Sequence, residues 1–196
     1  MYHYAGNNPV KYTDPDGKKI HKLTDLQWTV VKNNLNNLSA NLGTLITKLD
    51  ECNNTAENLD SKIIDSARMY ITSEFGSLPL DISAMKSILS NLKKHIDSLD
   101  RNDFRYDDKT NAFAYTNPFF DDIYLGDIFF ETPDSGGYDT KEGTILHEVT
   151  HYIFMLRTAD YTYKDEEMRK LPDNGVFKSK QNNANNWEYF YEKIFD

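Results

Sequence analysis

The residues best suited to chemistry form one short run, His147-Glu148-Val149-Thr150-His151. In a helix, side chains four positions apart project from the same face, so His147 and His151 can bind one zinc ion together. Glu148, directly after the first histidine, is placed to take a proton from a water that the metal activates. The alternative is a helix face with two structural histidines and an exposed glutamate, but chance makes this pattern rare in a chain with 5 histidines. The run, an HExxH motif, therefore predicts a Zn²⁺ site with Glu148 as general base.

A catalytic zinc ion needs a third protein ligand and an open position for water. The other histidines, His3, His21 and His95, all precede the run, so we expect a carboxylate from the residues that follow it. The candidates are Asp160, Asp165, Glu166, Glu167, Asp173, Glu188 and Glu192. Asp160 is favoured because the helix can end near residue 157 and the chain can then fold back. A purely structural aspartate in a turn fits the residues equally well.

Three helices are predicted to form the scaffold that precedes this site. Thr24 and Gln27 have the spacing of a capping box, which would start the first helix. Its apolar residues recur every three or four positions, at Val31, Leu35, Leu38, Leu42, Leu45 and Leu49. The second and third helices have the same period, at Leu59, Ile63, Ala67 and Tyr70 and then, after Asp81, at Ile82, Met85, Leu89, Leu92 and Ile96. We interpret these stripes as core.

After residue 104 the apolar period shortens towards two, which is typical of strands. Short strands or extended segments are predicted at residues 113–115, 123–125 and 128–130. Asp139 is the expected N-cap of a helix from about residue 140 to 156, with Glu142 three positions on. An irregular connection to about residue 180 leads to a final helix, whose expected buried residues are Ala184, Trp187, Tyr191 and Ile194. The predicted fold class is α+β, with a helical N-terminal half, a small β region and an active-site helix.

The charge of the chain restricts its partners. There are 22 Lys+Arg against 31 Asp+Glu, a formal net charge of −9. Nucleic acids and anionic membranes both require a basic face, so we expect neither as the main partner. The single cysteine, Cys52, excludes an intrachain disulfide. No run of 18 apolar residues is present, and the N-terminus lacks the apolar core of a signal peptide, so we expect delivery by other means.

Residues 1–19 differ from the rest of the chain, because turn formers replace any periodic apolar face. The segment YHYAGNNPVKYTDPDG resembles the closing motif of the Rhs-repeat-associated core, in which a repeat shell ends and a variable C-terminal domain begins. The resemblance implies that residues 1–19 are a remnant or linker and that residues 20–196 form the domain delivered with the shell. Such domains are usually toxins, which implies an effector neutralised in its producer by a cognate immunity protein.

A second resemblance covers roughly residues 110–196. The run of two histidines, followed by Thr158-Ala159-Asp160-Tyr161-Thr162-Tyr163, resembles the aspzincin metallopeptidases, the group of deuterolysin and the peptidyl-Lys metalloendopeptidases. It implies a zincin-like fold in which His147, His151 and Asp160 hold zinc and Glu148 is the general base. Tyr163 would donate a hydrogen bond to the oxyanion of the tetrahedral intermediate.

The chain departs from the family pattern at three positions. Arg157 and Lys164 replace the glycines that flank the aspartate motif. In the lysine-specific members an aspartate and a glutamate form a cation-binding pocket, and the matching residues here are Asn185 and Glu188. These two are the expected substrate-binding residues. Because one of the two charges is absent, we expect weaker selectivity for lysine.

Three other hypotheses remain open. Glu188 could be the third ligand, as in thermolysin-like enzymes, with Asp160 structural. The zinc could instead staple a non-enzymatic interaction module, in which Glu148 would have no measurable role. A nuclease toxin is the third, although the acidic charge opposes it. The hypothesis we carry forward is a zinc endopeptidase that binds its peptide extended along an edge strand formed by residues 112–130.

Overall fold

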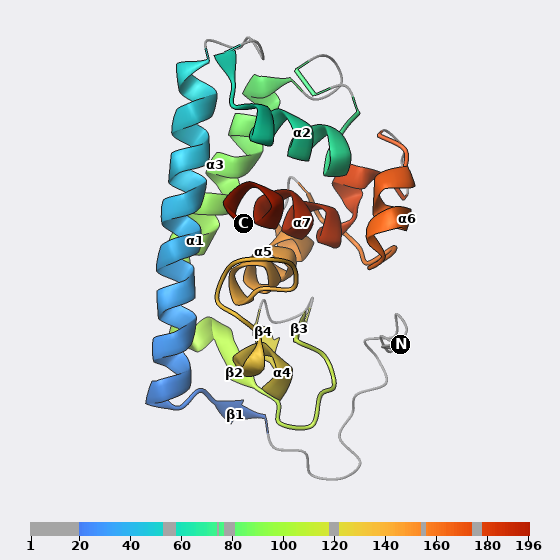
Figure 1. Ribbon diagram of the computed structural model, residues 1–196. Helices are drawn as coiled ribbons and strands as arrows, with labels where there is room; N and C mark the ends of the chain where they lie inside the picture. The colour runs from blue at the N-terminus through green and yellow to red at the C-terminus, as the bar shows by residue number, and fades with distance from the viewer. Residues whose placement is uncertain are drawn as a thin grey trace.

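In the computed structural model most helices pack against one another, and a small sheet lies at one end of the molecule, in the lower part of the view in Figure 1. It describes residues 20–52, 58–73, 75–76, 81–117, 122–153, 156–173 and 178–196. The predicted linker of residues 1–19 lies outside the described residues. The mixture of helices with one small sheet confirms the predicted α+β class.

The helical half is as predicted. Its helices are α1 (Asp25–Glu51), α2 (Ser61–Tyr70) and α3 (Ile82–Ser98). The capping box is present, because the side chain of Thr24 accepts from the backbone of Gln27 at 3.2 Å and the Gln27 side chain accepts from the backbone of Thr24 at 2.9 Å. All the residues predicted for the three apolar stripes are buried. Burial of each leucine contributes roughly 1.5–3 kcal/mol, so the packing of α1 against α3 holds this half together.

The sheet has four strands in the order β1-β2-β4-β3. They are β1 (His21–Lys22), β2 (Phe104–Tyr106), β3 (Ala114–Thr116) and β4 (Ile123–Leu125). The β2–β4 pair is parallel, with Phe104 opposite Ile123, and the other two pairs are antiparallel. Strand β3 is an edge of this sheet and contacts α5 (Lys141–Tyr152), the helix that carries the two histidines. The strands predicted near residues 114 and 124 are therefore confirmed to within one residue.

The strand predicted at residues 128–130 is wrong, because these residues belong to the short helix α4 (Asp127–Glu131). The chain turns at Gly126, whose N–H donates to the carbonyl of Phe113 at 3.0 Å. A β-carbon at Gly126 would lie 2.6 Å from Thr110 Cγ2, so only glycine permits this close approach. The turn ends β4, and the helix that follows buries Phe129 completely.

The remaining helices are α5 (Lys141–Tyr152), α6 (Asp165–Lys170) and α7 (Ala184–Phe195), with short 3-10 turns at Arg101–Asp103 and Lys180–Asn182. The N-cap of α5 is Thr140, whose hydroxyl accepts from the N–H of Gly143 at 2.9 Å, and not Asp139 as predicted. Asp139 instead has a φ of 58°, outside the conformation of an N-cap. Helix α6 lies in the connection that was predicted to be irregular. Its acidic first turn and basic last turn both suit the helix dipole.

Helix α7 lies between α2 and α5 in the middle of the molecule (Figure 1). Of its four predicted core residues, Ala184, Trp187 and Tyr191 are buried, and Ile194 is half-buried. Helix α1 also reaches this central layer through Asn41. Its amide donates to Tyr191 Oη at 2.8 Å and to Glu142 Oε2 at 3.3 Å. The helical half therefore holds both α5 and α7 in place.

Candidate metal centre

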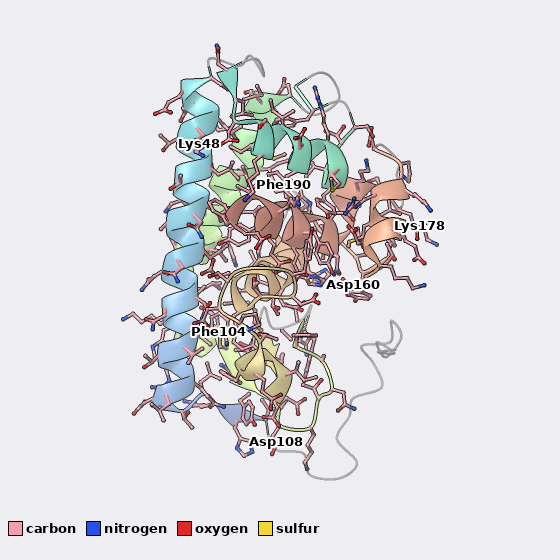
Figure 2. All side chains as sticks on the ribbon, in the orientation of Figure 1. Lys48, Phe104, Asp108, Asp160, Lys178 and Phe190 are labelled. Carbon is pink, nitrogen blue, oxygen red and sulfur yellow. The ribbon has the colours of Figure 1, made fainter. Side chains whose placement is uncertain are left out.

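The two histidines of α5 and Asp160 come together at one point. Asp160 Oδ1 lies 3.1 Å from His147 Nε2 and 3.4 Å from His151 Nε2. One ligand atom from each of the three residues lies within 4.8 Å of the others. Figure 2 shows Asp160 beside α5. The structure thus brings together the three residues that the sequence proposed as metal ligands.

The outer nitrogens of the two imidazoles have their own partners. His151 Nδ1 lies 3.0 Å from the backbone carbonyl of Thr158, and His147 Nδ1 lies 3.0 Å from Glu188 Oε2. A carbonyl can only accept, so Nδ1 of His151 carries a proton, and Nε2 presents a lone pair when the ring is neutral. Asp160 Oδ1 is buried and, among the described residues, has no hydrogen-bond donor. Two imidazole nitrogens and a carboxylate oxygen that converge on one point fit a divalent cation, and two imidazoles with one carboxylate suit zinc.

The buried imidazoles and carboxylates of the site shift one another's pKa values. Burial disfavours the imidazolium form of His147, but the carboxylates of Asp160 and Glu188 outweigh this and raise its pKa. Burial also works against the ionised form of Asp160, yet the two imidazoles hold its pKa well below the usual range. The Asp160 carboxylate is therefore ionised at neutral pH, as a metal ligand must be.

The loop that carries Asp160 is pinned back onto α5. The N–H of Thr158 donates to the carbonyl of Thr150 at 3.2 Å, and the two hydroxyls lie 2.7 Å apart. This return requires α5 to end at Tyr152, four residues before the predicted end. Arg157, which replaces a family glycine, has a φ of 44° and so retains the left-handed backbone that glycine favours. Lys164, at the second replaced glycine, has an ordinary φ of −92°.

Asn183, a residue that the sequence analysis missed, braces the same loop from the other side. Its Oδ1 accepts from the N–H of Tyr161 at 2.8 Å and of Thr162 at 3.3 Å, and its Nδ2 donates to the Thr162 carbonyl at 3.1 Å. Ala159 pairs with Asn183 as an isolated parallel β-bridge. The start of α7 therefore fixes the backbone on both sides of Asp160. The asparagine-rich sequence before α7 is the only signal of this role, and it does not identify a partner.

Glu148 and Tyr163 lie next to the three converging side chains. Glu148 is buried on α5, and this burial raises its pKa although His147 and His151 oppose the shift. A carboxylate with a raised pKa is a better base than an exposed one. The half-buried ring of Tyr163 stacks parallel to that of His147, with 6.3 Å between centroids.

Two further carboxylates reach α5 from α7. Glu188 is 4% exposed and faces Nδ1 of His147, on the far side of the ring from the metal-facing Nε2. This placement does not suit the thermolysin-like hypothesis, which needs Glu188 among the ligands. Glu192 accepts from the backbone N–H and the hydroxyl of Thr140 at 2.7 and 2.8 Å. Burial, together with the charge of Glu188, raises the pKa of Glu192 to about 9.

Asn185, the other residue predicted to bind substrate, lies on α7 one turn before Glu188. It is 4% exposed, and its Oδ1 has no hydrogen-bond partner among the described residues. An unsatisfied buried acceptor is costly, which singles this oxygen out as a position open to a donor.

The geometry and the fold together define a candidate site for one metal ion, built on one helix and a returning loop. A family model described as lysine-specific metallo-endopeptidase, aspzincin M35, matches residues 79–192. The chain belongs to this family, whose metal is zinc.

Three curated relatives are similar over part of their length. An extracellular protease of Aeromonas hydrophila is 30% identical over 155 residues, which cover 76% of this chain and 43% of the relative. Peptidyl-Lys metalloendopeptidases of Armillaria mellea and Grifola frondosa are each 33% identical, over 43% and 56% of this chain and 24% and 33% of their own length. The chain thus spans less than half the length of the curated relatives it matches.

The zinc peptidase from Grifola frondosa has the same fold, with a TM-score of 0.58 and 21% identity over 87% of this chain and 96% of that one. The likeness extends beyond the family match and includes the helical half. Within the part of the chain that the structure describes, no helix combines the length and the apolar character needed to cross a membrane.

Proposed function

We propose that this chain is a zinc-dependent endopeptidase that hydrolyses peptide bonds. The observation that carries the proposal is the convergence of His147 Nε2, His151 Nε2 and Asp160 Oδ1, with Glu148 on the same helix. Zinc held by these three residues would polarise the scissile carbonyl and lower the pKa of the attacking water. A structural metal alone would not need an adjacent buried carboxylate with a raised pKa.

The residues around the metal have separate tasks in this mechanism. Glu148 accepts one proton from the attacking water as the new C–O bond forms. It returns that proton to the amide nitrogen as the C–N bond breaks, so the leaving group departs as a neutral amine and Glu148 is regenerated. Tyr163 donates a hydrogen bond to the carbonyl oxygen while that oxygen carries negative charge.

We propose that the substrate peptide binds extended along β3, the sheet edge that contacts α5. The names of the family and of two relatives point to lysine beside the cleaved bond. Preference for lysine is expected to be weak here, because Asn185 carries no charge and Glu188 already faces His147.

The biological role we propose is that of a delivered effector. It rests on the likeness of residues 1–19 to the end of an Rhs-repeat core. An Rhs shell would then carry the domain out of the producing cell, and a cognate immunity protein would protect the producer. Secretion also agrees with the Aeromonas hydrophila relative, an extracellular protease.

The test of the peptidase proposal is cleavage-site mapping by mass spectrometry on a denatured proteome. The zinc-loaded protein is compared with Glu148→Gln, which keeps the side-chain volume but removes the base. Cuts made by the wild type alone would support a peptidase, and the residues beside each cut would report its selectivity. Zinc binding without cuts would favour the non-enzymatic, zinc-stapled module.

The effector role has a separate test. Expression of the domain in a bacterial host should be toxic, and Glu148→Gln should abolish the toxicity. Toxicity that persists in the variant would refute proteolysis as its cause and favour the nuclease hypothesis. The integrity of DNA and RNA in the same cells would test that hypothesis.

A further inference from the structure

Helix α7 directs two glutamates at α5 from successive turns. Glu188 reaches the ring of His147, and Glu192 reaches the N-cap residue Thr140. Like charges four positions apart destabilise an isolated helix, so local helix stability does not explain the pair. Both side chains are nearly inaccessible, at 4% and 3% exposed. Their contacts with α5 are therefore the feature that needs an explanation.

The structure assigns Glu188 to a positioning role: its carboxylate fixes the tautomer and the ring orientation of His147, so that Nε2 faces Asp160 and His151. This inference rests on the proposed metal site. An imidazole can carry its proton on either nitrogen, and an acceptor at Nδ1 selects the form whose Nε2 is free to bind metal. Glu188 Oε2 lies 3.0 Å from that Nδ1, with both groups buried.

The acceptor that selects the tautomer differs between the two histidines. His151 uses the backbone carbonyl of Thr158, seven residues on, which the returning loop supplies. His147 uses a side chain 41 residues on, from another helix. The orientation of His147 therefore depends on the identity of one side chain, and mutation can test it directly.

The packing of the two helices accommodates this contact. Helices α5 and α7 are in contact, and the space at Gly143, one turn before His147, is filled by side chains of α7. A β-carbon there would lie 3.1 Å from Glu188 Cγ and 2.7 Å from Glu192 Cδ. Glycine thus leaves the space through which both glutamates reach α5.

A positioning role and a substrate-binding role predict different measurements. If Glu188 orients His147, removing its carboxylate weakens zinc binding in the absence of any substrate. If Glu188 binds a cationic substrate side chain, its removal lowers the preference for lysine and leaves zinc affinity unchanged. Asn185→Ala is the matched control, because Asn185 lies on the same helix with the same exposure but has no hydrogen bond to His147.

The experiment measures the zinc Kd of the wild type, Glu188→Ala, Glu188→Gln and Asn185→Ala by competition with a chromophoric chelator. We expect Glu188→Ala to raise the Kd about 10–100-fold, as loss of such an outer partner typically does. Glu188→Gln should fall between, because its amide oxygen still accepts from Nδ1–H but carries no charge. Asn185→Ala should match the wild type. An unchanged Kd for Glu188→Ala overturns the inference.

A second measurement covers the case in which Glu188→Ala does not fold. The ¹⁵N chemical shifts of the His147 ring, recorded at increasing pH until the ring is neutral, report its tautomer in the metal-free wild type and in Glu188→Gln. We expect a protonated Nδ1 in the wild type, and a wild-type ring protonated on Nε2 alone would overturn the inference. Neither measurement requires catalysis. A wild type that binds zinc but cuts no peptide would therefore refute the proposed function and leave this inference standing.

Discussion

Gly143 provides the sharpest test of how α5 and α7 fit together. In Gly143→Ala, the new methyl group would lie 2.7 Å from Glu192 Cδ and 3.1 Å from Glu188 Cγ. Carbon atoms prefer separations of about 3.5–4.0 Å, so the Glu192 carboxylate must move by about 1 Å. Such a shift stretches its hydrogen bonds to Thr140, now 2.7 and 2.8 Å long, beyond bonding distance.

Two opposing contributions decide the sign of the change in the free energy of unfolding. Loss of these two hydrogen bonds costs about 1 kcal/mol each, and the bond from the Asp139 N–H to Glu192 Oε2, 3.3 Å long, adds a third such cost if it also breaks. Alanine gains back about 1 kcal/mol over glycine inside a helix. The free energy of unfolding of Gly143→Ala should therefore fall by about 1–2 kcal/mol, measured by urea denaturation of the metal-free protein with an unchanged m-value.

Gly43 in α1 supplies the matched control. A β-carbon there would meet only Lys93 Cε, at 3.4 Å, which is an ordinary contact with a flexible side chain. Gly43→Ala should therefore stabilise the protein by up to about 1 kcal/mol. In a Glu192→Ala background, Gly143→Ala should become stabilising as well. If Gly143→Ala stabilises the otherwise unchanged protein, the Glu192 carboxylate does not hold the start of α5 and the reasoning fails.

The remaining predictions concern the metal, the pH dependence and the returning loop. Asp160→Asn should lose zinc while Glu148→Gln keeps it, as measured by metal analysis after dialysis; equal retention in both would exclude Asp160 as a ligand. The folded-state pKa of Glu192 is raised to about 9 from 4.5, so between these values the folded protein keeps a proton that the unfolded chain releases. The contribution of Glu192 is therefore fully present below about pH 4.5 and is lost as the pH rises towards 9. The free energy of unfolding, measured by urea titration at pH 6 and pH 8.5, should therefore decrease less with pH in Glu192→Gln than in the wild type. An equal decrease in both proteins would contradict the assignment. Arg157→Gly should exceed Arg157→Ala in unfolding free energy by about 1 kcal/mol, because only glycine adopts a φ of 44° without strain; equal stabilities would show that the turn is unstrained.

Features governed by short-range patterns could be predicted from the sequence. The capping box of α1 depends on residues three apart, and the leucine stripe of α1 follows from helical periodicity. The pairing of His147 with His151 follows from the same periodicity, since both lie on one face of one helix. The interval of nine residues from His151 to Asp160 also indicated that the chain can return to the helix, although the residues alone left a structural role for Asp160 equally open.

Features that depend on distant partners could not be predicted in this way. Helix α5 ends at Tyr152 because Thr150 and Thr158 pin the returning chain, and a pattern of apolar residues contains no such signal. Asn183 braces the metal loop through contacts 21 and 22 residues away. The strand predicted at residues 128–130 failed for a related reason, because the close approach at Gly126 turns the chain into a helix.

The dependence of α5 on α7 also constrains when the site can form during synthesis. His147 precedes Glu188 by 41 residues. Ribosomes add roughly 5–20 residues per second, so about 2–8 s pass between the synthesis of these two residues. During that interval His147 lacks its tautomer-selecting partner, the loop around Asp160 lacks the brace of Asn183, and Asn41 of α1 awaits Tyr191, 150 residues further along. The nascent chain therefore carries the three converging side chains before it can arrange them, and their arrangement is complete only when α7 docks.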